Sequence, residues 1–165
     1  MKKAALMMVS VLMLLFTFSA SAEVYYYPDG NNPLFSITFP NHWSVEPEEE
    51  LLHASPPDET IYLGLWAVED AETVEDAINA LESSMGDLIQ NVEFGDPEEF
   101  ENNGIAFLGI DGAGTDEDGN PMNISFGIFT PDGETFCILF YLGTPENEAK
   151  YEDSLTGIIL SIQAE

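Results

Sequence analysis

A short acidic segment near the middle of the chain has the residue types of a calcium-binding turn. Residues 116–120 read Asp-Glu-Asp-Gly-Asn, and calcium prefers clustered carboxylate and amide oxygens on a tight turn. The match to an EF-hand loop fails at the next position, because Pro121 stands where that loop requires glycine. Asp116, Asp118 and Asn120 are therefore weak candidates for calcium ligands, and a solvated hairpin turn is the alternative interpretation.

Other residues that could do chemistry are few and isolated. His42 and His53 are the only histidines, and no ligand spacing relates them to each other or to a cysteine. The single Cys137 lies in an apolar stretch, which favours a buried structural thiol over an activated nucleophile. No GxSxG segment indicates a serine hydrolase. We therefore expect no catalytic residues and no cofactor, with calcium as the open exception.

The first 22 residues have the three parts of a secretory signal peptide. Two lysines precede an apolar run at residues 4–18, and Ala20-Ser21-Ala22 forms a small-x-small cleavage site. The run is about fifteen residues long, whereas a membrane-spanning helix needs ~20. We expect cleavage between Ala22 and Glu23, no stable membrane anchor afterwards, and a periplasmic or secreted product.

The charge of the chain is extreme. Lysine plus arginine number 3 against 31 acidic residues, which gives a formal net charge of −28. Loss of the two signal lysines leaves one lysine, Lys150, against the same 31 acids, a charge of −30. Such a field repels phosphate backbones and excludes nucleic acid as a partner. Relief of the repulsion requires dissolved ions, a bound cation or a basic partner, so an unknown envelope protein or a cation is the expected partner.

Two segments have the periodicity of amphipathic helices. Thr73 is placed to cap the first, and Asp76 occupies the capping-box position. Its apolar stripe comprises Val74, Ala77, Ile78, Leu81, Met85 and Leu88. The second helix starts at Thr144-Pro145, and its stripe comprises Tyr151, Leu155, Ile158 and Ile162. We expect Leu81 and Ile158 to face the core.

The remaining apolar segments predict strands. Residues 35–39 alternate apolar and polar, and residues 61–68 are apolar at nearly every position, which is typical of a strand covered on both faces. The stretch from Ile105 to Leu142 reads as three strands joined by turns at Asp118-Gly119 and Asp132-Gly133, an antiparallel meander.

Two polar regions are expected to lack regular core strands. Residues 46–54 predict a loop or an irregular edge hairpin. The acidic cluster at residues 96–101, next to the Asn102-Asn103-Gly104 turn, predicts a charged loop. The whole pattern favours an α+β fold: an antiparallel β-sheet of about six strands with helices packed on both faces, forming one domain over residues 23–165.

Several structural motifs together resemble the PsbP-like superfamily. They are the opening Phe35-Ser36-Ile37-Thr38-Phe39-Pro40-Asn41-His42-Trp43, the mid-chain helix, the Asp-Gly hairpins and the closing helix that ends Ile159-Leu160-Ser161-Ile162. The resemblance spans residues 27–162 and implies a non-catalytic scaffold. No functional residue carries over, and the basic docking surface and lipid-anchoring cysteine of some members are absent from this sequence.

The expected function follows from the compartment, the charge and this resemblance. We expect an exported, soluble, non-catalytic binding or accessory protein of the cell envelope, present as a monomer. The alternative is a divalent-cation protein that binds calcium at its acidic turns, and a hydrolase without a recognisable motif comes a distant third.

Overall fold

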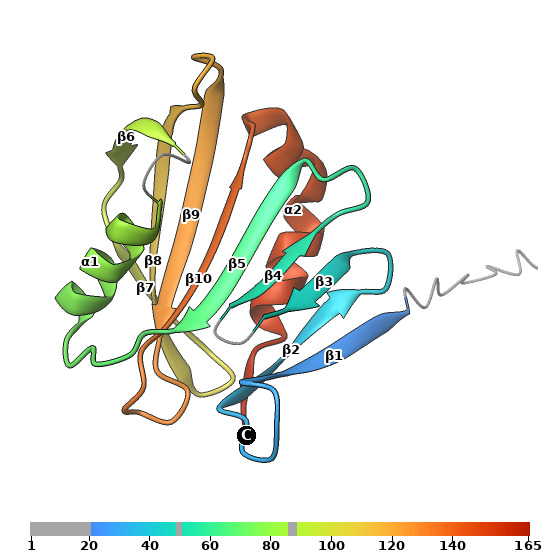
Figure 1. Cartoon of the computed structure of the whole chain (residues 1–165), viewed down its shortest axis with the longest axis vertical. Helices are drawn as coiled ribbons and strands as arrows, with labels where there is room; N and C mark the ends of the chain where they lie inside the picture. The colour runs from blue at the N-terminus through green and yellow to red at the C-terminus, as the bar shows by residue number, and fades with distance from the viewer. Residues whose placement is uncertain (1–20, 49–50, 86–88) are drawn as a thin grey trace, which may run out of the picture.

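The computed structural model describes residues 21–48, 51–85 and 89–165, which form two antiparallel sheets and two helices (Figure 1). The larger sheet has the order β3-β4-β5-β10-β9-β8-β6, and β7 pairs with the other half of the β8 edge. Its strands are β3 (Ser44–Pro47), β4 (Leu52–Ser55), β5 (Ile61–Ala67), β6 (Gln90–Phe94), β7 (Glu98–Asn102), β8 (Ile105–Thr115), β9 (Pro121–Phe129) and β10 (Cys137–Gly143). The predicted meander is β8, β9 and β10.

The smaller sheet has the order β1-β2-β11 and brings the two ends of the described chain together. Its strands are β1 (Ala22–Tyr27), β2 (Phe35–Pro40) and β11 (Gln163–Ala164). The predicted strand at residues 35–39 is β2, and its Phe35 and Ile37 are fully buried. Residues 1–20 of the expected signal peptide, which was predicted to end at Ala22, lie outside the described residues.

The prediction of about six strands was wrong, since the described residues contain eleven. The additional strands are short, polar or at a sheet edge: β1, β3, β6, β7 and β11. The charged loop predicted at residues 96–101 largely forms β7, which pairs with β8 from Glu98 to Asn102. Acidic residues are poor strand formers in general but are common on exposed edge strands. The acidic composition therefore predicted a loop where the chain forms an edge strand.

Both predicted helices are present. α1 (Val74–Met85) begins with the predicted capping box: the backbone N–H of Thr73 donates to the Asp76 carboxylate at 2.9 Å, and the Asp76 N–H donates to the Thr73 hydroxyl at 3.2 Å. Leu88 of the predicted stripe lies outside the described residues. α2 (Pro145–Leu160) has Thr144 as its N-cap. Neither helix is long and apolar enough to cross a bilayer, nor is any other helix of the described chain.

The buried side chains form two apolar clusters, and β10 alternates between them. Ala77, Leu81 and Met85 of α1 share one cluster with Ile138 and Phe140 of β10. The other cluster contains Cys137 and Leu139 of β10, Leu155 and Ile158 of α2, and the buried residues of β2. Leu81 and Ile158 are each 1% exposed, so the prediction that they face the core is confirmed. Val74 was wrongly placed in the buried stripe, because at the first turn of α1 it is 38% exposed.

The full cover predicted for the strand at residues 61–68 is not found. Ile61, Leu63 and Leu65 are buried, but Tyr62 is exposed and Trp66 is half-buried. These two rings contact Phe140 at centroid distances of 5.6 Å, and the Phe140 ring lies over Gly64. Aromatic side chains from the sheet itself therefore partly cover this face of β5.

Candidate functional site

A pair of glycines forms the floor of a groove in the described chain. Gly109 of β8 lies opposite Gly127 of β9, which in turn lies opposite Leu139 of β10. Both glycines remain partly exposed. A Cβ atom built on Gly127 would meet only the Phe107 ring at 3.7 Å, and one on Gly109 would meet the Phe100 ring at 3.4 Å. The floor is thus low because side chains are missing there, not because the backbone is distorted.

One wall of the groove is Phe100 of β7. Its ring stacks on Phe107 with a centroid distance of 5.0 Å, and Phe107 stacks on Phe129 at 4.8 Å. Phe100 is nevertheless 41% exposed, whereas Phe107 and Phe129 are buried. The stack extends the apolar core outward to a rim that solvent reaches.

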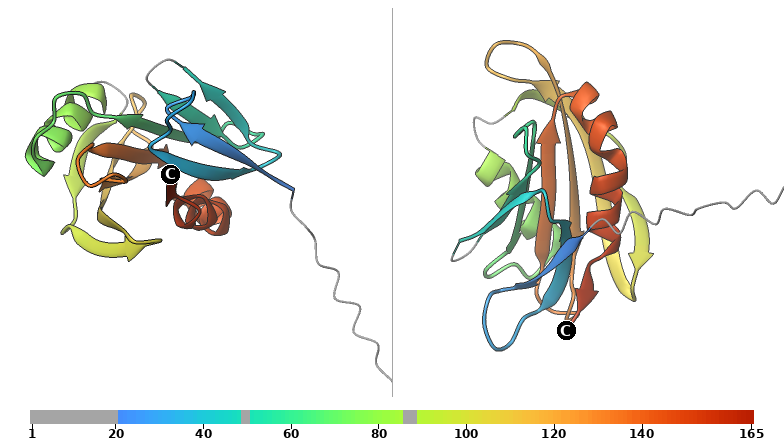
Figure 2. Two further views of the ribbon diagram at one scale, coloured as in Figure 1. Left: turned by 90° about the horizontal axis from the view of Figure 1, so that it is seen from below. Right: turned by 90° about the vertical axis from the view of Figure 1, so that its right-hand side faces the viewer.

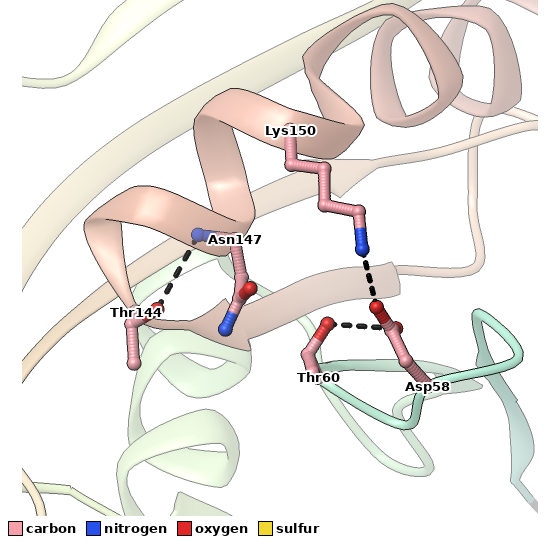
Figure 3. A network of polar contacts seen from close by, with 5 residues as sticks. All are labelled: Asp58, Thr60, Thr144, Asn147 and Lys150. Atoms are coloured by element: carbon pink, nitrogen blue, oxygen red, sulfur yellow. Dashed lines mark hydrogen bonds and ion pairs between the residues drawn. The ribbon is translucent and has the colours of Figure 1, made fainter.

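The opposite wall is α2, which lies on one face of the large sheet, next to the edge strand β7 (Figure 2). The helix starts where Thr144 accepts a hydrogen bond from the Asn147 N–H at 3.3 Å (Figure 3). Leu155 and Ile158 face the core, and the half-buried Ile159 lines the groove. We call the space between Phe100 and Ile159, above Gly109 and Gly127, the β7–α2 groove.

Two asparagine side chains tie the two walls together at one end. The Asn103 amide donates to the carbonyls of Leu160 and Ile162 at 3.0 and 2.8 Å, and the Asn102 amide donates to the carbonyl of Ile159 at 3.2 Å. Asn103 has a φ of 51°, and it precedes Gly104 with a φ of 80°, as a tight two-residue hairpin requires. The turn between β7 and β8 thereby caps the last carbonyls of α2 and joins the two walls at this end of the groove.

The other end of the groove is polar. Asp111, Ser125 and Tyr141 lie in register on β8, β9 and β10. The Ser125 hydroxyl donates to Asp111 Oδ1 at 2.5 Å, and the Tyr141 hydroxyl donates to Glu148 Oε1 of α2 at 3.0 Å. Burial, reinforced by the negative charge of Glu148, raises the pKa of Tyr141 to about 12, so its phenol keeps the proton that it donates. The Asn123 amide donates to the other oxygen of Glu148.

Three adjoining cavities make up the groove and its open end. A cavity of ≈130 Å³ lies over the two glycines, one of ≈380 Å³ runs along α2, and one of ≈390 Å³ adjoins β8 and β9. They share lining residues, since Tyr141 and Ile159 border the first two and Asp111 and Ser125 border the first and third. Ligand pockets of proteins typically span about 300–1,000 Å³, so the combined space suits a small molecule.

The carboxylates at the open end form no ion pair among the described residues. They are Glu93, Asp111, Glu148 and Glu152. The ion pairs of the described chain lie elsewhere: Lys150 binds Asp58 at 2.5 Å (Figure 3), and His53 lies 3.3 Å from Glu46. This end of the groove is therefore strongly negative.

The predicted calcium ligands lie on the β8–β9 turn, beyond this polar end. Asp116 Oδ1 accepts the N–H groups of Asp118 and Asn120 at 3.0 and 2.8 Å, and Oδ2 accepts the Asn120 amide at 2.8 Å. These bonds lower the pKa of Asp116, with the Asn120 side chain as the largest cause. The turn thus joins Asp116 and Asn120 directly, while Asp118 contributes its backbone N–H. No group of three or more His, Cys, Asp or Glu side chains in the described parts of the chain is arranged to hold a metal ion.

The groove residues were not predicted as a site. The Asn103-Gly104 pair was the available signal, because Asn-Gly between two strands marks a tight hairpin and would have placed β7 beside β8. No sequence spacing relates Asp111 to Glu148, which come together only through strand register and the start of α2.

The strand order and the placement of the two helices define an antiparallel α+β fold of a recognisable class. The structure is similar to that of cyanobacterial PsbP (CyanoP) from Synechocystis, with a TM-score of 0.62 and 12% identity over 88% of this chain and 94% of that one. It is also similar to LpqN of Mycobacterium tuberculosis, described as involved in cell envelope biogenesis, with a TM-score of 0.55 and 14% identity over 87% of this chain and 90% of that one. PA94 of Pseudomonas aeruginosa, described as a putative regulator, matches with a TM-score of 0.52 and 12% identity over 87% and 97%.

No protein-family model matches the chain, and no curated protein sequence matches it. The structural similarity nevertheless confirms, at the level of the fold, the resemblance found in the sequence. The chain has a PsbP-like fold.

Proposed function

We propose that the protein is an exported, non-catalytic binding protein of the cell envelope and that the β7–α2 groove is its binding site. The observation that carries this proposal is the groove itself, an apolar floor and two walls that end in a polar, anionic opening. Pockets that combine apolar lining with a few convergent polar groups are the usual form of a small-molecule site. The envelope role described for LpqN and the sequence of the first 22 residues support the compartment.

A non-catalytic role is supported by the state of the nucleophile candidate. Cys137 is fully buried, and burial raises the pKa of its thiol to about 12, so the reactive thiolate is scarce at neutral pH.

The core arrangement that we propose places one helix on each face of the large sheet, because β10 alternates between the cluster containing α1 and the cluster containing α2. A monomer is part of the proposal, and calcium binding at Asp116, Asp118 and Asn120 remains its alternative.

Groove binding can be tested with a neutral, polarity-sensitive dye such as Nile red. We expect saturable fluorescence enhancement with the wild-type protein and its loss in Gly127→Leu, since the added side chain enters space that is now open. Phe100→Ala, which removes an exposed wall residue, should weaken binding without the risk of overpacking. Gly157→Ala is the matched control, because nothing lies within 4 Å of a Cβ atom at that position.

Circular dichroism checks that each variant is folded. Absence of saturable dye binding by the wild type would show that the groove is not the site. The same conclusion would follow if folded Gly127→Leu and Phe100→Ala bound the dye as tightly as the wild type. Export is tested separately by mass spectrometry of the envelope fraction, where we expect an N-terminus at Glu23.

A further inference from the structure

The open end of the β7–α2 groove has a charge that the described chain does not neutralise. Glu93, Asp111, Glu148 and Glu152 line it, and the ion pairs of the described residues involve other carboxylates. The full sequence contains 31 acids and three basic residues, so the surrounding field is negative as well. An anionic ligand would be repelled from this end, and a cationic ligand would be attracted to it.

Hydrogen bonds hold two of these carboxylates in place. Ser125 donates to Asp111, while Tyr141 and Asn123 donate to opposite oxygens of Glu148. The donors stand on β9 and β10, so the sheet positions acceptors that a ligand does not need to order. A protonated primary amine offers three N–H donors and no acceptor, which complements such a set of oxygens.

Behind the charged end, the groove is mainly apolar, and its two walls are joined at the far end. Phe107, Phe100 and Ile159 surround the glycine floor, and the asparagine contacts to the end of α2 join the two walls at the far end. Walls that are joined at one end favour a ligand that inserts the end of a chain over a polypeptide that passes through the groove.

We propose that the β7–α2 groove binds a free amphiphile with a protonated amine head. The apolar tail lies between Phe100 and Ile159 above the glycine floor, and the ammonium group donates to Asp111 and Glu148. This inference rests on the proposed function, because it assigns a ligand class to the same groove.

The test is calorimetry with three probes of one tail length: octylammonium, 1-octanol and octyl sulfate. Octylammonium should bind saturably with one site per chain, 1-octanol more weakly, and octyl sulfate least. Raising the salt concentration should weaken octylammonium binding and leave 1-octanol binding unchanged, because only the former depends on charge. Octyl sulfate binding as tight as that of octylammonium would overturn the proposal.

Isosteric variants test whether the carboxylates of Asp111 and Glu148 bind the ammonium group. Asp111→Asn and Glu148→Gln should each weaken octylammonium binding about tenfold, the usual effect of losing a charge-assisted hydrogen bond, with little change for 1-octanol. Glu75→Gln is the control, since Glu75 is an exposed acid in the first turn of α1, away from the groove. Equal weakening by all three variants would mean that the attraction is diffuse and would overturn the assignment of Asp111 and Glu148.

The outcomes separate this inference from the proposed function. If Gly127→Leu and Phe100→Ala abolish 1-octanol binding while the two carboxylate variants leave octylammonium affinity intact, the groove is a binding site but its amine preference is wrong. If those groove variants affect no probe, both proposals fail. Tighter binding of an acetylated Leu-Leu-Lys amide than of octylammonium would replace the free amphiphile with a lysine-bearing polypeptide.

Discussion

At the scale of single residues, the Lys150–Asp58 pair should give the protein a measurable pH response. The hydrogen bond from Lys150 is the largest cause that lowers the pKa of Asp58 below its ordinary range. Because the folded-state pKa is depressed, the pair stabilises the folded protein at neutral pH, and this contribution is lost as the pH falls below about 4. Lys150→Met should move the Asp58 titration, followed by carboxyl NMR, back toward its ordinary range.

Lys150→Arg keeps the charge and is the control for this experiment. Its Asp58 titration should stay low. An unchanged titration in Lys150→Met would show that the other donors to Asp58, Thr60 (Figure 3) and Tyr151, keep its pKa low without the lysine. Both residues of the pair are largely exposed, so we expect only a small change in melting temperature.

The candidate site could not be predicted from the sequence, because the sequence patterns of its residues are typical of other structural features. Asp116 has the composition of a metal ligand, but its oxygens bond to the turn that contains it. Gly109 and Gly127 look like weak points of two strands, and only the register of β8 and β9 makes them a shared floor. A groove whose floor is formed by glycines has no characteristic sequence motif.

At the scale of elements, the link between the β7–β8 turn and the end of α2 should stabilise the fold. Asn103→Ala removes the amide that donates to Leu160 and Ile162 and places alanine at a positive φ, so we expect a loss of about 1–3 kcal/mol in the free energy of unfolding. Asn91→Ala is the matched control, because Asn91 also has a positive φ but its amide donates a longer bond, to Thr115 at 3.4 Å, and to no carbonyl at the end of α2 among the described residues. Equal losses would assign the effect to backbone conformation alone.

The core faces of the two helices allow a second test at this scale. Leu81→Ala and Ile158→Ala each delete a nearly fully buried aliphatic side chain and should cost about 2–5 kcal/mol in denaturant unfolding. Leu160→Ala is a useful comparison on α2, because Leu160 is 54% exposed and should lose much less. Unchanged midpoints for both core variants would contradict the assigned faces.

The elements that the sequence predicted are those whose periodicity is strong. α1, α2, β2 and the meander of β8, β9 and β10 each carry an apolar stripe or alternation that local physics can interpret. β7 has the sequence Glu-Glu-Phe-Glu-Asn, and its strand conformation comes from pairing with β8 across a tight turn. Which strands pair is decided only in the folded chain. Strands that depend on their pairing partner therefore cannot be predicted from the residue pattern of the segment itself.

At the scale of the whole molecule, salt should stabilise the protein. Folding brings carboxylates closer together, which raises the electrostatic free energy of a chain with a formal charge of −28. The screening length falls from ~8 Å at ~0.15 M to ~3 Å at ~1 M, so sodium chloride should raise the melting temperature smoothly over this range. A melting temperature that is flat or falls from ~0.05 to ~1 M would contradict this expectation.

Calcium gives the control for the salt experiment. Generic screening predicts a graded response that the double variant Asp116→Asn, Asp118→Asn leaves unchanged. A specific site predicts saturation at low calcium and loss of that effect in the double variant, and this result would establish the calcium alternative.

The shared edge of β8 has a consequence for how the molecules behave in concentrated solution. β6 and β7 lie end to end along that edge, so the outermost backbone of the sheet belongs to two short strands that carry Glu93, Glu98, Glu99 and Glu101. A strand from another copy that paired there would bring its own carboxylates against this row. We expect the edge to resist intermolecular β-pairing at neutral pH and to lose this protection when acid neutralises the glutamates. Light scattering should therefore rise on acidification. In a variant with all four glutamates changed to glutamine, the rise should begin at a higher pH. The same onset pH in both proteins would show that aggregation starts elsewhere.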